Sequence, residues 1–307
     1  MKIAFLFSGQ GAQYPGMGRG LYDAYPSVRE LYQTANEVLG YDLAALSFEG
    51  GEAEIAKTAV AQPLIYAMSL AALTAAREHG IEPVACAGHS LGEYAALTAC
   101  GVFDVKSGFR IIDARAKAMQ SAADTAGGTM YAVIGSTADE ISSVCEQTDG
   151  YVLPVNFNST AQTVIAGEEP AAHAAADTLS AMGARVIRLN VSAAFHSRLM
   201  AGAAKEFSSF LTGLSYCQPN TAFYSNVTGD RIAEFGDLAA YLTTHLVSPV
   251  RFTEELAAMS RDGIDAYLEL GPGKTLTGFV KKTLRGSAAY NIEDAASLEK
   301  AVLSLKG

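Results

Sequence analysis

The stretch VACAGHSLGEYAALTA, residues 84–99, decides how the rest of the chain is interpreted. Its first four residues form a short apolar run typical of a buried strand, and the residues from Glu93 onward have a helical pattern. Between them lies Gly88-His89-Ser90-Leu91-Gly92, and Gly-x-Ser-x-Gly between a strand and a helix is the pattern of a nucleophile elbow. The Leu91 N–H and the positive end of the helix then lie where an oxyanion would develop. The stretch therefore predicts Ser90 as a nucleophile.

The apolar patterns outside this turn predict an α/β fold. We expect strands at 2–7, 84–87, 223–226 and 266–270, and helices at 26–39, 58–78, 104–123, 237–246 and 253–261. A strand followed by a nucleophile elbow is typical of a parallel sheet with helices on its faces. We therefore predict a large catalytic subdomain of α/β-hydrolase-like fold with a parallel sheet, formed by residues 1–127 and 193–307.

The segment between these two parts has a different pattern. It alternates as strand (130–134), helix (138–146), strand (152–157), strand (162–166), helix (168–182) and strand (185–189). The order β-α-β-β-α-β is that of a ferredoxin-like unit. We predict an inserted ferredoxin-like small subdomain at residues 128–192.

Composition excludes several classes of protein. The chain has 307 residues, of which 50% are hydrophobic, and 32 acidic residues outnumber 22 basic ones. An acidic chain is a poor general partner for nucleic acid or an anionic membrane. No apolar run approaches the roughly 18 residues of a membrane helix, and four cysteines without paired spacing indicate buried thiols in a reducing cytoplasm. We expect a cytoplasmic protein that binds neither nucleic acid nor membrane.

A serine nucleophile needs a base, and the chain offers five histidines. His89 adjoins Ser90 and would point away from it across the turn, whereas His196 and His245 both remain candidates. His196 is the preferred one because it lies where the chain re-enters the large subdomain. The histidines and cysteines have no metal-ligand spacing, so no metal is expected.

The chain resembles the acyltransferase family of fatty acid and polyketide synthesis, to which malonyl-CoA:acyl carrier protein transacylases belong. The resemblance spans essentially the whole chain and is carried by motifs in family order: Gly9-Gln10-Gly11, Gly88-His89-Ser90-Leu91-Gly92-Glu93, Arg115-x-Lys117-x-Met119-Gln120, Asn158-Ser159 with Gln162, Phe195-His196-Ser197, Ser248-Pro249-Val250-Arg251-Phe252 and Glu269-Leu270-Gly271-Pro272-Gly273.

This resemblance implies a ping-pong acyl transfer for fatty acid biosynthesis. Ser90 would take the malonyl group from malonyl-CoA with His196 as base, and the N–H groups of Gln10 and Leu91 would form the oxyanion hole. The phosphopantetheine thiol of acyl carrier protein would then collect the malonyl group from the serine ester. The resemblance implies no cofactor beyond these thioester substrates.

The resemblance also implies three substrate-binding residues. Alone, Arg115 in a predicted helix would be interpreted as a solvated arginine, but the family motif makes it the partner of the malonyl carboxylate, which a guanidinium holds through two hydrogen bonds. Phe195 implies an unbranched malonyl group, and Asn158 completes the set. Two positions depart from the family pattern: Ala193 stands where many malonyl-type domains have histidine, and His245 stands where bacterial relatives often have the glutamine whose main-chain carbonyl orients the catalytic histidine. We expect His245 to keep that role.

Other functions remain open from the sequence. The same fold could serve a polyketide pathway as a free-standing acyltransferase, and a serine esterase would share the elbow but needs an acidic triad member between serine and histidine. For an acidic carrier protein we expect docking at basic residues near the cleft, and we expect a monomer. The docking candidates are Arg185, Arg188, Arg198, Lys274, Lys281, Lys282 and Arg285.

Overall fold

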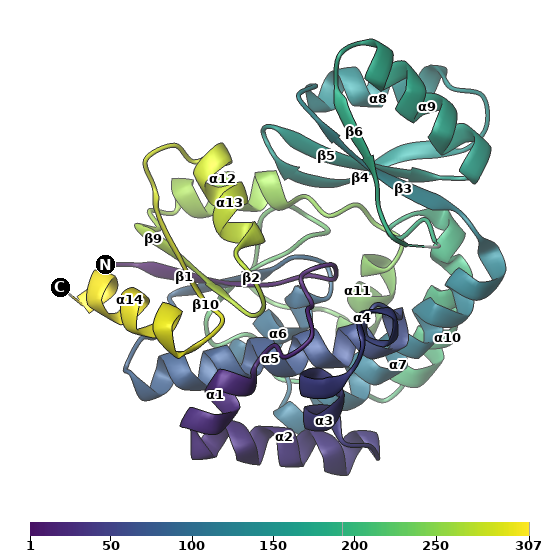
Figure 1. Ribbon diagram of the computed structural model, residues 1–307. Coiled ribbons are helices and arrows are strands. Elements are labelled where there is room, and N and C mark those ends of the chain that lie inside the picture. Colours follow the sequence, from purple (N-terminus) through teal and green to yellow (C-terminus); the bar gives the residue numbers. More distant parts are fainter. Residues whose placement is uncertain (192, 307) are drawn as a thin grey trace.

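The computed structural model describes residues 1–191 and 193–306, and residues 192 and 307 lie outside the described part. The chain forms two sheets (Figure 1). The larger has six strands in the order β10-β9-β1-β2-β7-β8, and the smaller has four in the order β4-β5-β3-β6. The strands of the larger sheet are β1 (Ile3–Phe7), β2 (Ala85–Gly88), β7 (Ala222–Tyr224), β8 (Arg231–Ile232), β9 (Ala266–Leu270) and β10 (Ala288–Ile292).

The larger sheet is parallel except for its last strand. β10, β9, β1, β2 and β7 pair in parallel, whereas β8 pairs antiparallel with β7. Every residue of β1 is buried, as expected for a central strand covered by helices on both faces. The α/β-hydrolase-like large subdomain predicted from the sequence is confirmed.

Helices cover both faces of this sheet. On the face that carries α5 they bury the largest apolar cluster, and α12 and α13 cover the other face (Figure 1). The helices of this part of the chain are α1 (Arg19–Ala24), α2 (Pro26–Leu39), α3 (Leu43–Glu49), α4 (Glu52–Ile55), α5 (Thr58–Glu78), α6 (Gly92–Ala99), α7 (Val105–Ala126), α10 (Ala201–Leu211), α11 (Leu238–His245), α12 (Phe252–Arg261), α13 (Thr275–Thr283) and α14 (Ala295–Lys306), with a short 3₁₀ turn at Arg198–Met200.

The second sheet belongs to the insert. Its strands are β3 (Thr129–Ile134), β4 (Val152–Ser159), β5 (Gln162–Gly167) and β6 (Arg185–Arg188), with α8 (Ala138–Gln147) and α9 (Glu169–Ala181) on one face. All neighbouring strands are antiparallel. The order of connections is that of a ferredoxin-like unit, which confirms the predicted fold of the insert. The subdomain boundaries, 1–127 with 193–307 and 128–192, remain a prediction, since residue 192 is not described.

Two sequence expectations were wrong. Helix α5 is long and apolar enough to cross a membrane by length and composition, with a mean hydropathy of 1.5, although no run of that kind was expected. Of its most apolar stretch, 83% is buried inside the fold, so these apolar residues form part of the protein core. Of the four free cysteines, Cys217 is exposed, whereas the other three are buried as expected. The sequence expectations also omitted α10, β10 and α14.

The fold brings the ends of its central strands together. β1 and β2 are parallel neighbours with Phe7 opposite Gly88, so the turns that carry Gln10 and Ser90 leave the sheet at the same edge. The small subdomain stands over this edge (Figure 1). Open α/β sheets place ligand sites at the carboxyl ends of their strands, and the site lies there.

Candidate active site

Ser90 stands at the turn between β2 and α6 in a backbone conformation that L-residues rarely adopt. Its φ is +53°, and the left-handed region costs a non-glycine residue about 1–2 kcal/mol. The turn is possible because its two glycines lack side chains. A Cβ on Gly88 would lie 2.0 Å from the carbonyl carbon of Gly92, and a Cβ on Gly92 would lie 2.1 Å from the carbonyl oxygen of Phe7. The predicted elbow is therefore present.

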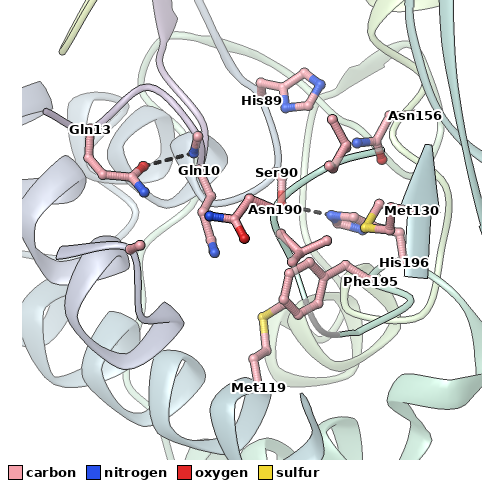
Figure 2. A pocket seen from close by; sticks show the side chains of 14 residues that line it. Gln10, Gln13, His89, Ser90, Met119, Met130, Asn156, Asn190, Phe195 and His196 are labelled. Carbon is pink, nitrogen blue, oxygen red and sulfur yellow. Dashed lines mark hydrogen bonds between the residues drawn. The ribbon is translucent and has the colours of Figure 1, made fainter. Parts of the chain in front are cut away.

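His196 is the histidine that meets this serine. Its Nε2 lies 2.7 Å from Ser90 Oγ (Figure 2). It is also the second non-glycine residue with positive φ in the described chain, at +60°. The distance is that expected between a nucleophile and its general base, so of the two candidates His196 and not His245 lies within reach of Ser90, and its role as base remains a prediction.

Among the described residues, main-chain carbonyls and no acidic side chain orient His196. Its Nδ1 lies 3.0 Å from the carbonyl oxygen of Ser248 and 3.3 Å from that of His245. Both oxygens accept, so Nδ1 carries the proton and Nε2 is free to accept the proton of Ser90. Sequence reasoning expected the His245 carbonyl and missed that of Ser248, the nearer of the two. A serine esterase of the usual kind would place a carboxylate at this position.

The site keeps His196 neutral. Burial, the nearby charge of Arg115 and the His89 ring together lower the pKa of His196 to about 3. Only an unprotonated imidazole can accept a proton, so the base is in its active form at neutral pH.

Arg115, in α7, is buried beside the nucleophile. It is 1% exposed, its Nη2 lies 3.3 Å from Ser90 Oγ, and its Nη1 donates to Gln62 Oε1 over 2.6 Å. The guanidinium also lies over the Tyr94 ring at 5.1 Å. Its Nε has no hydrogen-bond partner in the described chain. Arg115 is therefore not a solvated helix arginine, and its described partners are neutral groups.

The nearest buried carboxyl does not compensate this charge. Burial raises the pKa of Glu93 to about 8, even though hydrogen bonds from Tyr241 and the Asn226 N–H and the charge of Arg115 act to lower it. The carboxyl is therefore largely protonated at pH 7. The site thus contains a buried positive charge with donors free for an anion, which is the arrangement that binds a carboxylate.

Two main-chain N–H groups near Ser90 are available to a ligand. Within the residues that the structure describes, neither Gln10 N nor Leu91 N donates to a protein acceptor, whereas Ser90 N donates to Asn226 Oδ1 over 2.7 Å. Free N–H groups at the start of a helix and beside a nucleophile are the elements of an oxyanion hole. The assignment of these two donors remains a prediction.

A cavity of about 400 Å³ opens over Ser90 and His196. Phe195, Met119 and Met130 supply apolar walls, and Gln10, Asn156 and Asn190 supply polar ones (Figure 2). Phe195 lines the cavity, and its contact with the substrate remains a prediction. A mostly apolar pocket with a few polar groups at the nucleophile is typical of a small acyl substrate site.

Asn158 lies outside this cavity. It lines a neighbouring one of about 220 Å³, where its Oδ1 lies 2.7 Å from His89 Nε2 and its Nδ2 donates to Gln162. The sequence analysis missed Gln62 and Asn226. The first is a glutamine in a buried helix and the second follows a short strand, and neither has a local pattern that marks it.

Comparison with known proteins decides the family. A model of the acyl transferase domain matches residues 4–302. The chain belongs to the acyl transferase family. This result confirms the resemblance seen in the sequence and shows the chain to be an acyltransferase.

Several relatives within the family match this chain along nearly their whole length. The chain is 37% identical to malonyl CoA-acyl carrier protein transacylase of Bacillus subtilis (strain 168), covering 99% of this chain and 98% of that protein. Malonyl CoA-acyl carrier protein transacylase from Clostridium perfringens has a solved structure with a TM-score of 0.96 and 36% identity, covering 100% of this chain and 98% of that one. A complex described as a type II PKS acyl-carrier protein with its malonyl-transacylase matches with a TM-score of 0.95 and 38% identity, covering 99% and 100%.

Proposed function

We propose that this protein is a cytoplasmic, monomeric transacylase that moves a malonyl group from malonyl-CoA to the phosphopantetheine thiol of acyl carrier protein for fatty acid biosynthesis. The observation that carries the proposal is the buried Arg115 guanidinium within 3.3 Å of the Ser90 hydroxyl. A serine that only transfers uncharged acyl groups has no use for this charge. The relatives named above support the choice of donor and acceptor.

The geometry supports the following reaction. Ser90 Oγ attacks the thioester carbonyl carbon while its proton moves to His196 Nε2, 2.7 Å away. The N–H groups of Gln10 and Leu91 hold the oxyanion, and the loss of one such donor costs about 3 kcal/mol of transition-state stabilisation. The carbon–sulfur bond breaks, and the proton on His196 goes to the departing thiolate of coenzyme A. The thiol of the carrier protein reverses these steps on the serine ester.

In both half-reactions the malonyl carboxylate stays bound to the Arg115 guanidinium. A bidentate pair of hydrogen bonds fixes the acyl group and selects malonyl over acetyl thioesters. Phe195 forms part of the wall and restricts branching at the α-carbon of the acyl group. Asn158 would act on a more distant part of the substrate, because it lies in the neighbouring cavity.

Intact-mass measurement after incubation with malonyl-CoA and with acetyl-CoA tests this function. We expect a malonyl adduct on the wild-type protein, none on Ser90→Ala and little acetyl adduct. In Arg115→Ala the preference should shift toward acetyl. Retained malonyl preference in that variant contradicts the role of Arg115, and a malonyl adduct on Ser90→Ala contradicts the nucleophile.

Carrier-protein docking has a candidate position among the predicted basic residues. Arg188 lines a cavity of about 690 Å³ that shares Gln10, Leu189 and Asn190 with the cavity over Ser90. Lys57, which the sequence analysis missed, lines the same cavity. Charge reversal of Arg188 and Lys57 together should raise KM for carrier protein with kcat preserved. Unchanged kinetics would remove this face as the docking site.

A solved structure supports the polyketide alternative. A structure similar to this chain is a complex with a type II PKS acyl-carrier protein. Rates measured with carrier proteins of both kinds distinguish the two pathways: fatty acid synthesis predicts the larger kcat/KM with the fatty acid carrier protein.

A further inference from the structure

The nucleophile and its base share an unusual property. Ser90 and His196 are the two non-glycine residues of the described chain with positive φ, at +53° and +60°. Such conformations persist only where surrounding contacts hold them. The contacts that hold these two residues therefore set their relative position.

Asn226, which follows β7, binds the main chain of the turn at Ser90 through its side-chain amide. Its Oδ1 accepts the Ser90 N–H over 2.7 Å, and its Nδ2 donates to the carbonyl oxygen of Gly88 over 2.6 Å. One carboxamide thus binds the chain at Ser90 and two residues before it. Asn226 is fully buried, and a further bond from Nδ2 to Glu255 Oε1 over 2.8 Å sets the orientation of its side-chain amide. The main-chain N–H of Asn226 donates to Glu93 Oε2 over 2.7 Å.

His245, the last residue of α11, connects this amide to the base. Its Nε2 lies 3.3 Å from Asn226 Oδ1, and its main-chain oxygen lies 3.3 Å from His196 Nδ1. The side chain is 1% exposed, and its Nδ1 has no partner in the described chain. Burial and the nearby Arg115 charge lower the pKa of His245. The ring is therefore neutral, and Nε2 carries the proton donated to Asn226.

We propose that the side chains of Asn226 and His245 form a link that sets the position of Ser90 relative to His196. Both are positioning residues, since neither touches the reacting atoms. The link continues from the Ser90 N–H through the Asn226 amide and the His245 ring to the His245 carbonyl, one of the two that orient His196. It rests on the proposed function, for which Ser90 and His196 must react together, and it assigns His245 a side-chain role besides its main-chain one.

The decisive variants are at His245, because an Asn226 variant loses several buried bonds at once and could fail to fold. His245→Gln offers an amide donor at nearly the same reach as Nε2, whereas His245→Met keeps a similar volume without a donor. Both retain the main-chain carbonyl. His173→Met, at an exposed position on α9, controls for the chemistry of the substitution.

Single-turnover acylation by malonyl-CoA measures the effect. We expect His245→Met to lower the maximal acylation rate at least tenfold, with the half-saturating malonyl-CoA concentration within twofold of wild type because Arg115 and the pocket walls are unchanged. His245→Gln should recover most of the rate, and His173→Met should match wild type. Melting temperatures of the two His245 variants within a few degrees of each other exclude a general loss of structure.

A second readout does not depend on the substrate. The rate at which a sulfonyl fluoride modifies Ser90 depends on the Ser90–His196 pair and not on malonyl recognition. His245→Met should be modified more slowly than His245→Gln. Equal rates for the two variants in both assays overturn the link. Slow modification of His245→Met in a protein that malonyl-CoA does not acylate would preserve the link and contradict the proposed function.

Discussion

Arg115 is held by an amide where buried arginines usually meet a carboxylate, since its Nη1 donates to Gln62 Oε1 over 2.6 Å. An amide positions the guanidinium without neutralising it. We expect Gln62→Glu, which has nearly the same shape, to pair with Arg115 and raise KM for malonyl-CoA tenfold or more. Acetyl loading should change little, because the acetyl group has no carboxylate.

Gln62→Met is the matched control for this prediction. It removes the acceptor but leaves the Arg115 charge uncompensated, so malonyl loading should fall less than in Gln62→Glu. Steady-state kinetics with both thioesters give the malonyl-to-acetyl ratio. A wild-type ratio in Gln62→Glu would show that the charge of Arg115 does not select the substrate.

The neutral state of His196 predicts an unusual pH profile. Burial, the Arg115 charge and the His89 ring lower its pKa to about 3, so the free enzyme keeps its base unprotonated well below pH 6. An ordinary imidazole of pKa near 6.5 would lose about 30-fold in rate by pH 5. We expect kcat/KM for acylation to stay nearly level between pH 7 and 5. An acid limb with a midpoint near 6.5 would contradict this environment.

At the scale of elements, α6 begins in close contact with the end of β1. A Cβ on Gly92 would lie 2.1 Å from the Phe7 carbonyl oxygen and 2.8 Å from that of Ser8. Main-chain atoms of a central strand cannot move aside cheaply. We expect Gly92→Ala to lower the free energy of unfolding by about 3 kcal/mol, as measured by urea denaturation. The variant should also form less malonyl adduct, as measured by intact mass.

Gly278→Ala provides the comparison. Gly278 lies inside α13, and a Cβ there would meet no atom within 4 Å. Alanine favours helix over glycine by up to about 1 kcal/mol, so this variant should be as stable as wild type or more so. Equal effects of the two substitutions would show that the elbow tolerates a side chain at Gly92.

At the scale of the whole molecule, buried carboxyls make stability depend on pH. Burial raises the pKa of Glu93 to about 8, whereas a glutamate in the unfolded chain has a pKa near 4.5. The folded state therefore keeps a proton that the unfolded state loses. The stability due to this proton is full below pH 4.5, falls by at most about 1.4 kcal/mol per pH unit as the pH rises, and levels off above pH 8.

Glu93→Gln isolates this contribution, because glutamine does not titrate. Urea denaturation of both proteins at pH 5, 6.5 and 8 should show wild-type stability falling relative to the variant as the pH rises. Burial and the nearby charge of Glu93 also raise the pKa of Glu255, so the pH dependence that remains in the variant reports the contribution of Glu255. A difference independent of pH would show that Glu93 is ionised in the folded protein.

Much of this architecture was predictable because its signals are local. Patterns of neighbouring residues predict the turn with its glycines around Ser90, the helices α2 and α5, and the order of strands and helices along the insert. The structure confirms all three. Even the N-cap of α11 at Asp237 follows from a local pattern, since its side chain accepts from Ala240 N. Elements with weaker patterns, such as β10 and α14, were missed.

The sequence by itself determined the turn at Ser90, the two fold types and, through its motifs, the family. Only the tertiary structure decided that His196 and not His245 meets the serine, that Arg115 is buried on an uncharged partner, and that Asn226 holds the turn. Ser90 is separated from His196 by 106 residues and from Asn226 by 136. Sequence patterns determine local structure over a few residues. These contacts, in contrast, form only when the parallel strands pack side by side and their carboxyl ends lie at one edge of the sheet.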